Sequence, residues 1–257
     1  MKGATICLDH LGGQEAAALI EDGRVTDLLL DSDLPRPGTI HRARAGRPVK
    51  GQGGIFLDTP DGPAFLRKIK GVAPGQMLLA QVTGFAEPGK AIPVTAKLLF
   101  KSRFAIVTPD APGVNISRAI RDEALRDHLL EIAHEEMGGA AAGLILRSSC
   151  ANAAADEIAE DIRVMADLAA RVMGDTAGPV EKLIEGDGPH ALAWREWTGP
   201  AQIAAEAGSF EAHGVLDTVE ALRDPCVALP GGGGMYVEPT RALVAVDINT
   251  GGDTSPA

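Results

Sequence analysis

Short apolar runs, separated by glycine and proline, fill residues 37–101 of the chain. Side chains of a strand alternate between two faces, and several short strands with regular turn signals are typical of a small closed barrel. An oligonucleotide-binding (OB) barrel has five strands, which is the number that this pattern predicts. The predicted strands are residues 38–45, 54–58, 64–68, 77–84 and 92–100.

Helical periodicity replaces this pattern in the next part of the chain. Residues 118–137 repeat apolar side chains on one side, with Ser117 as the predicted N-cap and Gly138 as the stop. Residues 153–173 are predicted as a second helix, capped by Asn152, because apolar side chains recur there at steps of three and four. This amphipathic stripe contains Ile158, Ile162, Met165, Ala169 and Val172.

The pattern is weaker toward the two ends of the chain. Residues 4–8 and 24–30 are predicted strands, joined by a polar segment. Residues 191–197 are predicted as a strand and residues 214–223 as a helix. A glycine run then leads into a terminal hairpin, and it lacks the Lys-Ser/Thr pair of a phosphate-binding P-loop.

Charge is distributed unevenly between the segments. The 257 residues have a net charge of −11, yet residues 34–108 contain twelve Lys and Arg against three acidic residues. This asymmetry predicts one module that meets phosphate backbones, beside an acidic remainder that does not. A basic patch that serves solubility, or that pairs with the acidic parts, is the alternative explanation.

Composition argues against several classes of protein. No apolar run approaches the roughly 18 residues of a membrane span, and the start lacks the apolar stretch of a signal peptide. We therefore expect a cytoplasmic protein without a membrane segment. Cys7, Cys150 and Cys226 are far apart and form no Cys-x-x-Cys pair, so we expect reduced and inert thiols.

Two polar residues end the last apolar run. Asp247 and Asn249 stand two positions apart on a predicted strand, so both side chains project from one face. Val244, Val246 and Ile248 are expected to pack on the opposite face. Magnesium prefers oxygen ligands such as these, which makes the pair a candidate metal site. The alternative is an ordinary buried strand that runs into a polar turn.

A candidate anion site follows a short buried strand at residues 143–146. Arg147, Ser148 and Ser149 come directly after it and precede the second predicted helix. A guanidinium, hydroxyl groups and backbone N–H groups near a helix start suit a phosphate. A Ser-Ser capping turn with Arg147 in a surface ion pair is the alternative.

Six segments, taken in order, resemble the N-terminal part of the ribonuclease E/G family, whose members are single-strand endoribonucleases that use magnesium. The segment Glu-Pro-Thr-Arg-Ala-Leu-Val-Ala-Val-Asp-Ile-Asn at residues 238–249 is the most specific. The others are Gly-Gly-Ile-Phe-Leu-Asp at 53–58, Pro-Ala-Phe-Leu at 63–66, Asn-Ile-Ser-Arg at 115–118, Gly-Leu-Ile-Leu-Arg-Ser at 143–148 and Leu-Pro-Gly-Gly at 229–232.

The resemblance implies an α+β multidomain fold. An S1-type OB β-barrel is inserted in a small ribonuclease-H-like scaffold, followed by an α/β 5′-sensor region and the start of a DNase-I-like region. The implied boundaries are 1–36 for the first scaffold strands, 37–101 for the RNA-binding barrel, 102–190 for the 5′-sensor region, 191–228 for the scaffold continuation and 229–257 for an incomplete catalytic region.

The resemblance also implies roles for residues of the barrel and its neighbour. Phe56 and Phe65 would form an aromatic RNA-binding platform with Lys90 beside it, and Arg118 would contact the RNA backbone. Bases stack on exposed aromatic rings and lysines attract the backbone, which suits single-stranded RNA of varied sequence. The alternative is that both Phe side chains fill the barrel core.

Two further sites are implied. Arg147 and Ser148 match the family's Arg-Thr pair for a 5′-monophosphate, and here Ser replaces Thr. Asp247 matches a metal-site aspartate that coordinates Mg²⁺, which activates water, while Asn249 orients the aspartate or the scissile phosphate. The family's second metal-binding aspartate lies on a later strand, so the resemblance implies a chain truncated before it.

The implied function is magnesium-dependent endoribonuclease cleavage in RNA processing and decay, acting on rRNA precursors and mRNA and favouring 5′-monophosphorylated ends. The full-length protein is expected to be a homo-oligomer. A non-catalytic S1-type RNA-binding protein for ribosome or transcript assembly is the first alternative. A regulatory protein that binds a small phosphorylated metabolite is the second.

Overall fold

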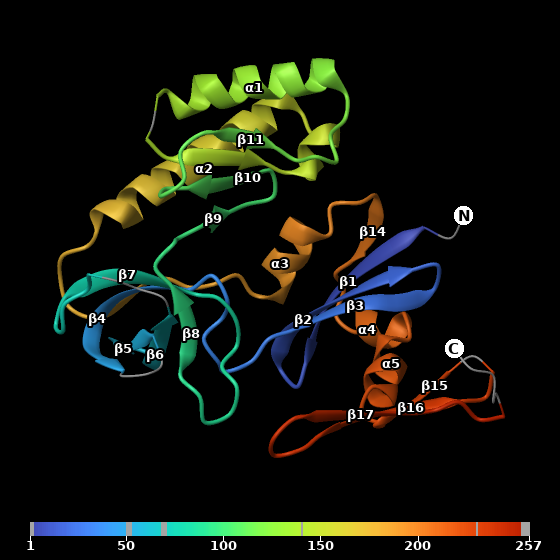
Figure 1. Ribbon diagram of the computed structural model, residues 1–257. Coiled ribbons are helices and arrows are strands. Elements are labelled where there is room, and N and C mark those ends of the chain that lie inside the picture. The colour runs from blue at the N-terminus through green and yellow to red at the C-terminus, as the bar shows by residue number, and fades with distance from the viewer. Residues whose placement is uncertain (1–2, 50–52, 68–70, 140, 230, 253–257) are drawn as a thin grey trace.

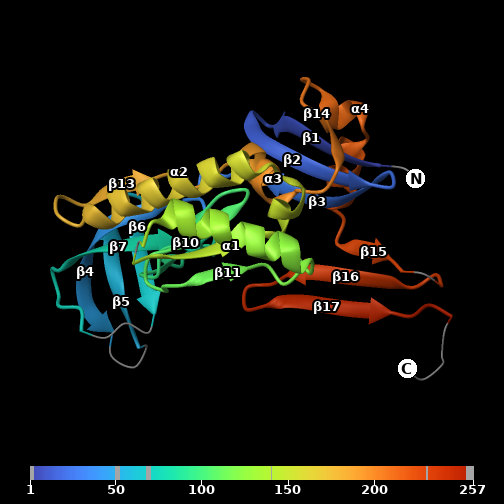
Figure 2. The same cartoon turned by 90° about the horizontal axis from the view of Figure 1, so that it is seen from above.

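The structure is a computed structural model that describes residues 3–49, 53–67, 71–139, 141–229 and 231–252. It is a mixed α+β structure in which these residues form four separate sheets (Figure 1). A barrel, an α/β layer and a sheet flanked by short helices lie against one another, and a terminal three-stranded sheet lies beside them (Figure 2). No helix of the described ranges is long and apolar enough to cross a membrane.

The barrel prediction is confirmed. The first strand pairs with both the second and the fourth, and the fifth joins the third to the fourth, so the five strands close on themselves in a way consistent with an OB-like fold. Small and branched side chains alternate into the interior, among them Ala43, Leu57 and Ala64. The strands are β4 (Ile40–Val49), β5 (Gly54–Thr59), β6 (Gly62–Arg67), β7 (Met77–Val82) and β8 (Ile92–Thr95).

The N-terminal sheet contains a strand that the sequence pattern did not predict. The polar connection expected between two strands is instead β2, an inner strand of the sheet, in which Ala16, Ala17 and Ala18 are fully buried. Alanine has a low strand propensity, but helices pack on both faces here and only small side chains fit. The strands, in sheet order, are β14 (Ala201–Ala204), β1 (Ala4–Leu11), β2 (Gln14–Glu21) and β3 (Arg24–Leu30).

The predicted strand at residues 191–197 is wrong, because α3 (Pro189–Glu196) occupies this position. Proline at the first helical position lacks only an N–H that would have no helical partner, and it presets φ for the helix. The helix predicted at residues 214–223 is confirmed as α5 (Val215–Ala221), and the short α4 (Ser209–Ala212) precedes it.

Two helices cover one face of the third sheet. Its order is β11 (Val114–Ile116), β12 (Gly143–Leu146), β10 (Ala105–Thr108) and β9 (Phe100–Lys101), with α1 (Glu123–Met137) and α2 (Ala155–Gly174) above it (Figures 1 and 2). The stripe of α2 faces this sheet: Ile158, Ile162, Ala169 and Val172 are buried in the largest core of the molecule. The predicted buried strand is confirmed as β12.

Both predicted helix N-caps are wrong. Asp122, rather than Ser117, caps α1, because its carboxylate accepts a hydrogen bond of 2.8 Å from the Leu125 N–H. Asn152 ends a 3₁₀ turn (η1, Ser148–Asn152) that the sequence analysis did not predict, and Ala154 precedes α2. The stop of α1 at Gly138 is confirmed, since this residue has φ 52° in the left-handed region.

A buried arginine joins the barrel to the segment after α2. The strand β13 (Glu181–Ile184) pairs with β4, and the Arg42 side chain lies between them. Its guanidinium pairs with Asp175 at 2.5 Å and with Glu181 at 2.9 Å. Arg42 is thus a structural residue, although it belongs to the basic segment of the sequence.

The terminal sheet has the order β15 (Cys226–Ala228), β16 (Gly234–Pro239) and β17 (Val244–Asn249). The hairpin prediction is confirmed, but the expected packing of Val244, Val246 and Ile248 is wrong within the described residues. Their side chains are 61%, 57% and 58% exposed. The alternation of the strand therefore forms an apolar face that no described element covers.

Candidate nucleic-acid interface

Phe56 and Phe65 form an aromatic pair on the outside of the barrel. They lie directly opposite each other on β5 and β6, with ring centroids 5.1 Å apart and planes tilted by 55°. Phe56 is 44% exposed and Phe65 is half-buried, while Ile55 and Leu57 point into the core. The alternative that both Phe side chains fill the core is therefore wrong.

Gly54 makes room for this pair. A Cβ atom at position 54 would lie 2.6 Å from Cζ of Phe65 and 2.7 Å from the carbonyl oxygen of Leu66. Only a residue without a side chain allows the Phe65 ring to lie across the start of β5. The ring position is thus set by the barrel backbone.

The two cationic residues predicted to bind RNA, Lys90 and Arg118, lie outside β5 and β6, the strands that carry the Phe pair. Lys90 stands in the turn between β7 and β8, where its exposed ammonium pairs with Glu87 at 2.5 Å. Arg118 is exposed in the turn between β11 and α1, within the α/β layer. Of the twelve cations in the basic segment, Lys50, Lys68 and Lys70 lie outside the described residues.

Arg147 and Ser148 lie together at the end of β12, as the sequence predicted. The backbone N–H of Arg147 donates to Phe104 O at 2.9 Å, which extends the strand by one bond. Its Nη1 donates to Ser102 O at 2.6 Å, and its Nη2 pairs with the Glu196 carboxylate. Ser148 is exposed at the first position of η1.

Glu196 is a second partner in this cluster. Burial raises the pKa of its carboxyl group, but hydrogen bonds from Arg195 and Arg147 outweigh that effect and hold the pKa below its ordinary value. Arg195 also pairs with Asp187. A phosphate that approaches Arg147 must therefore compete with a charged carboxylate.

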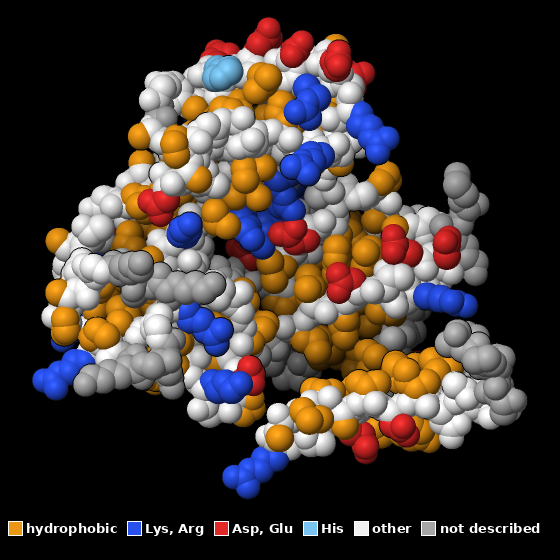
Figure 3. All heavy atoms as spheres, in the orientation of Figure 1, with side chains coloured by type: hydrophobic (Ala, Val, Ile, Leu, Met, Phe, Trp, Pro, Cys, Tyr) orange, Lys and Arg blue, Asp and Glu red, His pale blue; other side chains and the backbone are white. Residues whose placement is uncertain are grey.

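Sequence analysis missed Arg103 and Trp194. The Cζ atom of Arg103 lies 4.1 Å from the centroid of the Trp194 indole, and the guanidinium donates to Trp194 O. Trp194 stands on α3, where a strand was predicted, and the two residues are 91 positions apart. Figure 3 shows Lys and Arg side chains gathered on this face, over the region where α3 meets β9 and β10.

Asp247 and Asn249 occur on the face of β17 that the sequence predicted, and both are exposed. Asp247 lies opposite Tyr236, and the amide oxygen of Asn249 accepts the Gly251 N–H at 2.9 Å. Among the described residues, no three His, Cys, Asp or Glu side chains converge in a way that holds a metal ion. Asp247 offers one exposed carboxylate, a group of the kind that binds magnesium in proteins.

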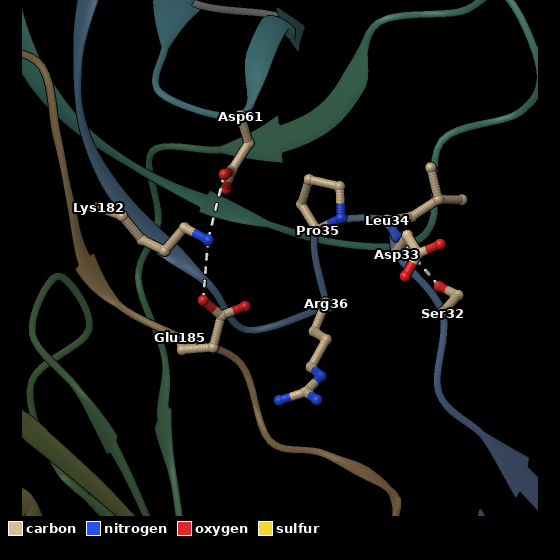
Figure 4. Close-up of a pocket in the computed structure, with 8 residues that line it drawn as sticks. All are labelled: Ser32, Asp33, Leu34, Pro35, Arg36, Asp61, Lys182 and Glu185. Atoms are coloured by element: carbon tan, nitrogen blue, oxygen red, sulfur yellow. Dashed lines mark hydrogen bonds and ion pairs between the residues drawn. The ribbon is translucent and has the colours of Figure 1, made fainter. Parts of the chain in front are cut away.

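A polar cavity of about 270 Å³ lies where the barrel meets the N-terminal segment (Figure 4). Lys182 bridges Asp61 at 3.1 Å and Glu185 at 2.8 Å, and Asp61 also contacts Nε2 of the buried His41 at 2.8 Å. Arg36 pairs with Asp31 nearby. Both cations that line the cavity, Arg36 and Lys182, are already paired with carboxylates, so the described residues offer no unpaired cation there for a phosphate.

Comparison with known proteins identifies the family. The Ribonuclease E/G family model matches residues 100–196 and 199–257. Ribonuclease E of Nostoc sp. (strain PCC 7120) is 23% identical, over 95% of this chain and 43% of its own length. Ribonuclease E of Synechocystis sp. is 25% identical, over 79% of this chain and 36% of its own length.

A shorter relative is similar along the chain as well. Ribonuclease G of Haemophilus influenzae is 23% identical, over 91% of this chain and 60% of its own length. The matches to these three relatives span between about a third and three fifths of the relatives' own lengths. The family model covers more than half of the present sequence. The chain therefore belongs to the ribonuclease E/G family.

Proposed function

We propose that this chain is part of a magnesium-dependent endoribonuclease that cuts single-stranded RNA in processing and decay. The part described here would bind the RNA and recognise its 5′ end. The observation that carries the proposal is the exposed Phe56–Phe65 pair on a closed barrel, in a chain of this family. The barrel would be of the S1 type, the N-terminal sheet a ribonuclease-H-like scaffold and the terminal sheet the start of a DNase-I-like region.

The aromatic pair suits unpaired bases. Stacking of one base on an exposed ring contributes about 1–3 kcal/mol and tolerates any base, because every base has a π face. A duplex keeps its bases stacked on each other, so the pair selects single strands. Arg44, Arg47 and Arg67 are exposed on β4 and β6, the two strands that flank β5, and would add attraction for the RNA backbone.

The end of β12 suits a terminal phosphate. An Arg guanidinium binds phosphate through parallel hydrogen bonds, and the Ser148 hydroxyl adds one donor. Glu196 holds the guanidinium in place before RNA arrives and competes with the phosphate afterwards. Binding of a 5′-monophosphate would release Arg147 from Glu196, while Arg195 retains the carboxylate at 2.7 Å.

Asp247 supports the catalytic part of the proposal. Magnesium bound there would supply activated water and stabilise the charge that develops on the scissile phosphate. Asp247 would contribute one carboxylate, and Asn249 would fix the loop that follows β17 through its hydrogen bond to Gly251. Oligomers of the full-length protein belong to the same proposal.

The 5′-end role is tested by comparing binding of 5′-monophosphorylated and 5′-hydroxyl oligonucleotides to the chain, with a chelator present. We expect the wild type to prefer the phosphorylated end and Arg147→Ala to lose that preference. Glu196→Gln removes the competing charge and should increase the preference by a few-fold. Leu222→Ala, at an exposed site on another segment, is the control. Equal preference in wild type and Arg147→Ala would refute the role.

A non-catalytic RNA-binding protein is the second candidate. It is favoured by the observation that the described residues contain no cluster of three metal-ligating side chains. The two candidates differ in one measurement, which is the cleavage of 5′-monophosphorylated single-stranded RNA with magnesium and with chelator. Magnesium-dependent cleavage that Asp247→Asn abolishes supports the nuclease, and binding without cleavage supports the alternative.

A further inference from the structure

Trp194 presents an indole ring to solvent beside the Arg147 cluster. Its side chain is 63% exposed, which is unusual for the largest apolar residue of a protein. Trp197, three residues later, is half-buried and its indole N–H donates to Asp27 at 3.1 Å. The exposure of Trp194 is therefore a property of this position and not of the whole segment.

Two guanidinium groups fix the end of α3 next to this ring. Arg103 donates to the carbonyl oxygen of Trp194, and Arg147 donates to that of Arg195 at 3.3 Å. The Ser149 hydroxyl donates to Arg103 O at 2.6 Å and holds that segment as well. Because the two guanidinium groups bind consecutive carbonyl groups, the residue that carries the indole directly precedes the residue whose carbonyl binds Arg147.

Arg103 differs from the two arginines beside it in having no carboxylate partner among the described residues. Arg147 and Arg195 each pair with carboxylates, whereas Arg103 has no ion pair within the part of the chain that the structure describes. Its guanidinium lies over the ring of Trp194 at 4.1 Å, and the Phe104 ring is 5.9 Å away. A cation without a carboxylate partner beside an exposed indole suits a ligand that has both an anionic group and a flat ring. A nucleotide has both, in its phosphate and its base.

We propose that Trp194 and Arg103 form a second stacking platform, which binds the base of a nucleotide at the 5′ end of RNA while Arg147 binds its terminal phosphate. The inference rests on the proposed function of the Arg147 site. One face of the indole carries Arg103, so the base would stack on the other. The platform would position the RNA end, and it differs from the Phe56–Phe65 pair, which lies on another sheet.

The first experiment compares oligonucleotides with and without individual bases. A short 5′-monophosphorylated oligoadenylate, and matched versions that lack the base of the first or the second nucleotide, are titrated into the 257-residue chain with a chelator present. We expect Trp194→Ala to weaken binding of the complete oligonucleotide by about 5- to 100-fold, as for the loss of one stacked base. The probe that lacks the stacked base, whichever of the two it is, should bind wild type and Trp194→Ala with equal affinity.

Trp194→Phe and Arg103→Lys refine this result. The Phe variant keeps an aromatic face and should restore most of the affinity, which also separates stacking from misfolding. The Lys variant keeps the charge but loses the planar group over the ring. An unchanged affinity in Trp194→Ala, or an equal loss with every probe, overturns the platform, and a surface for a protein partner would then be the remaining explanation for the exposed ring.

The second experiment observes the ring directly. The chain contains two tryptophans, so Trp197→Phe leaves Trp194 as the sole indole fluorophore. We expect the complete oligonucleotide to quench its emission and the oligonucleotide without the stacked base to leave it unchanged. If quenching occurs but 5′-phosphate and 5′-hydroxyl ends bind equally, the platform is retained and the 5′-end role fails. If the phosphate matters but quenching is absent, the platform fails.

Discussion

The barrel and the terminal sheet are built from the same alternation of apolar and polar side chains, yet only the barrel buries its apolar face. Closure of the five strands makes each strand cover the others, so Leu57 is 1% exposed. The terminal sheet has three strands in one layer, and Val246 remains 57% exposed. An alternating pattern therefore specifies two faces, but a second layer or closure is needed before one of them becomes a core.

The polar faces of the two regions also differ. The outer face of the barrel carries an aromatic pair that is complete within one hairpin, because Phe56 and Phe65 are cross-strand neighbours. The outer face of β17 carries Asp247 without a converging set of ligands among the described residues. Under the proposed function, the barrel surface would bind RNA on its own, whereas the terminal sheet would supply only part of a metal site.

The largest expected effect tests the difference in burial. Leu57→Ala should lower the free energy of unfolding by about 2–5 kcal/mol, because it removes buried methyl groups and leaves a cavity. Val246→Ala should lower it by less than about 0.5 kcal/mol, because the side chain is already hydrated. Urea unfolding followed by circular dichroism measures both. Similar losses in the two variants would mean that the terminal sheet is covered in solution.

The second prediction separates binding from chemistry. Phe65→Ala should weaken the binding of single-stranded RNA by about 1–3 kcal/mol, since one stacked base is lost. Asp247→Asn should leave binding in chelator unchanged, because a single exposed carboxylate contributes no contact there. Fluorescence anisotropy with a labelled oligonucleotide gives both affinities. A strong effect of Asp247→Asn on metal-free binding would place RNA on the terminal sheet instead.

The third prediction concerns the free energy of unfolding at low pH. Burial raises the pKa of Asp61, but hydrogen bonds from His41 and Lys182 outweigh it, so the pKa lies below its ordinary value of 3.8. The stability that these bonds contribute is fully present above that value and is lost as the pH falls through the lowered pKa. We expect Asp61→Asn to flatten the fall of the unfolding free energy at pH values below 3.8. The same pH dependence of the unfolding free energy in wild type and Asp61→Asn would show that the Asp61 carboxylate does not cause the loss of stability in acid.

The smallest expected effect probes the apolar face itself. Val246→Thr keeps the branched side chain that strands favour and should change the free energy of unfolding by less than about 0.5 kcal/mol. It should reduce the binding of an apolar dye such as ANS to the native chain, because the exposed face becomes more polar. Dye binding that does not change would show that this face is hidden in solution.

The sequence by itself determined the features that depend on neighbours in the chain. Strand alternation predicted the five barrel strands, helical spacing predicted the buried stripe of α2, and the hairpin pattern placed Asp247 and Asn249 on one face. Such patterns arise because the geometry of an element repeats every two or 3.6 residues. The resemblance to a family then named candidate residues that pattern alone left ambiguous.

The tertiary structure decided everything that depends on contacts between distant residues. It made an alanine-rich segment the inner strand β2, formed α3 where a strand was predicted, paired Arg147 with Glu196 and placed Arg103 over the Trp194 ring. It also left the apolar face of β17 without a cover among the described residues. Local periodicity says which side chains share a face, but what lies against that face is set by the packing of segments that are remote in sequence.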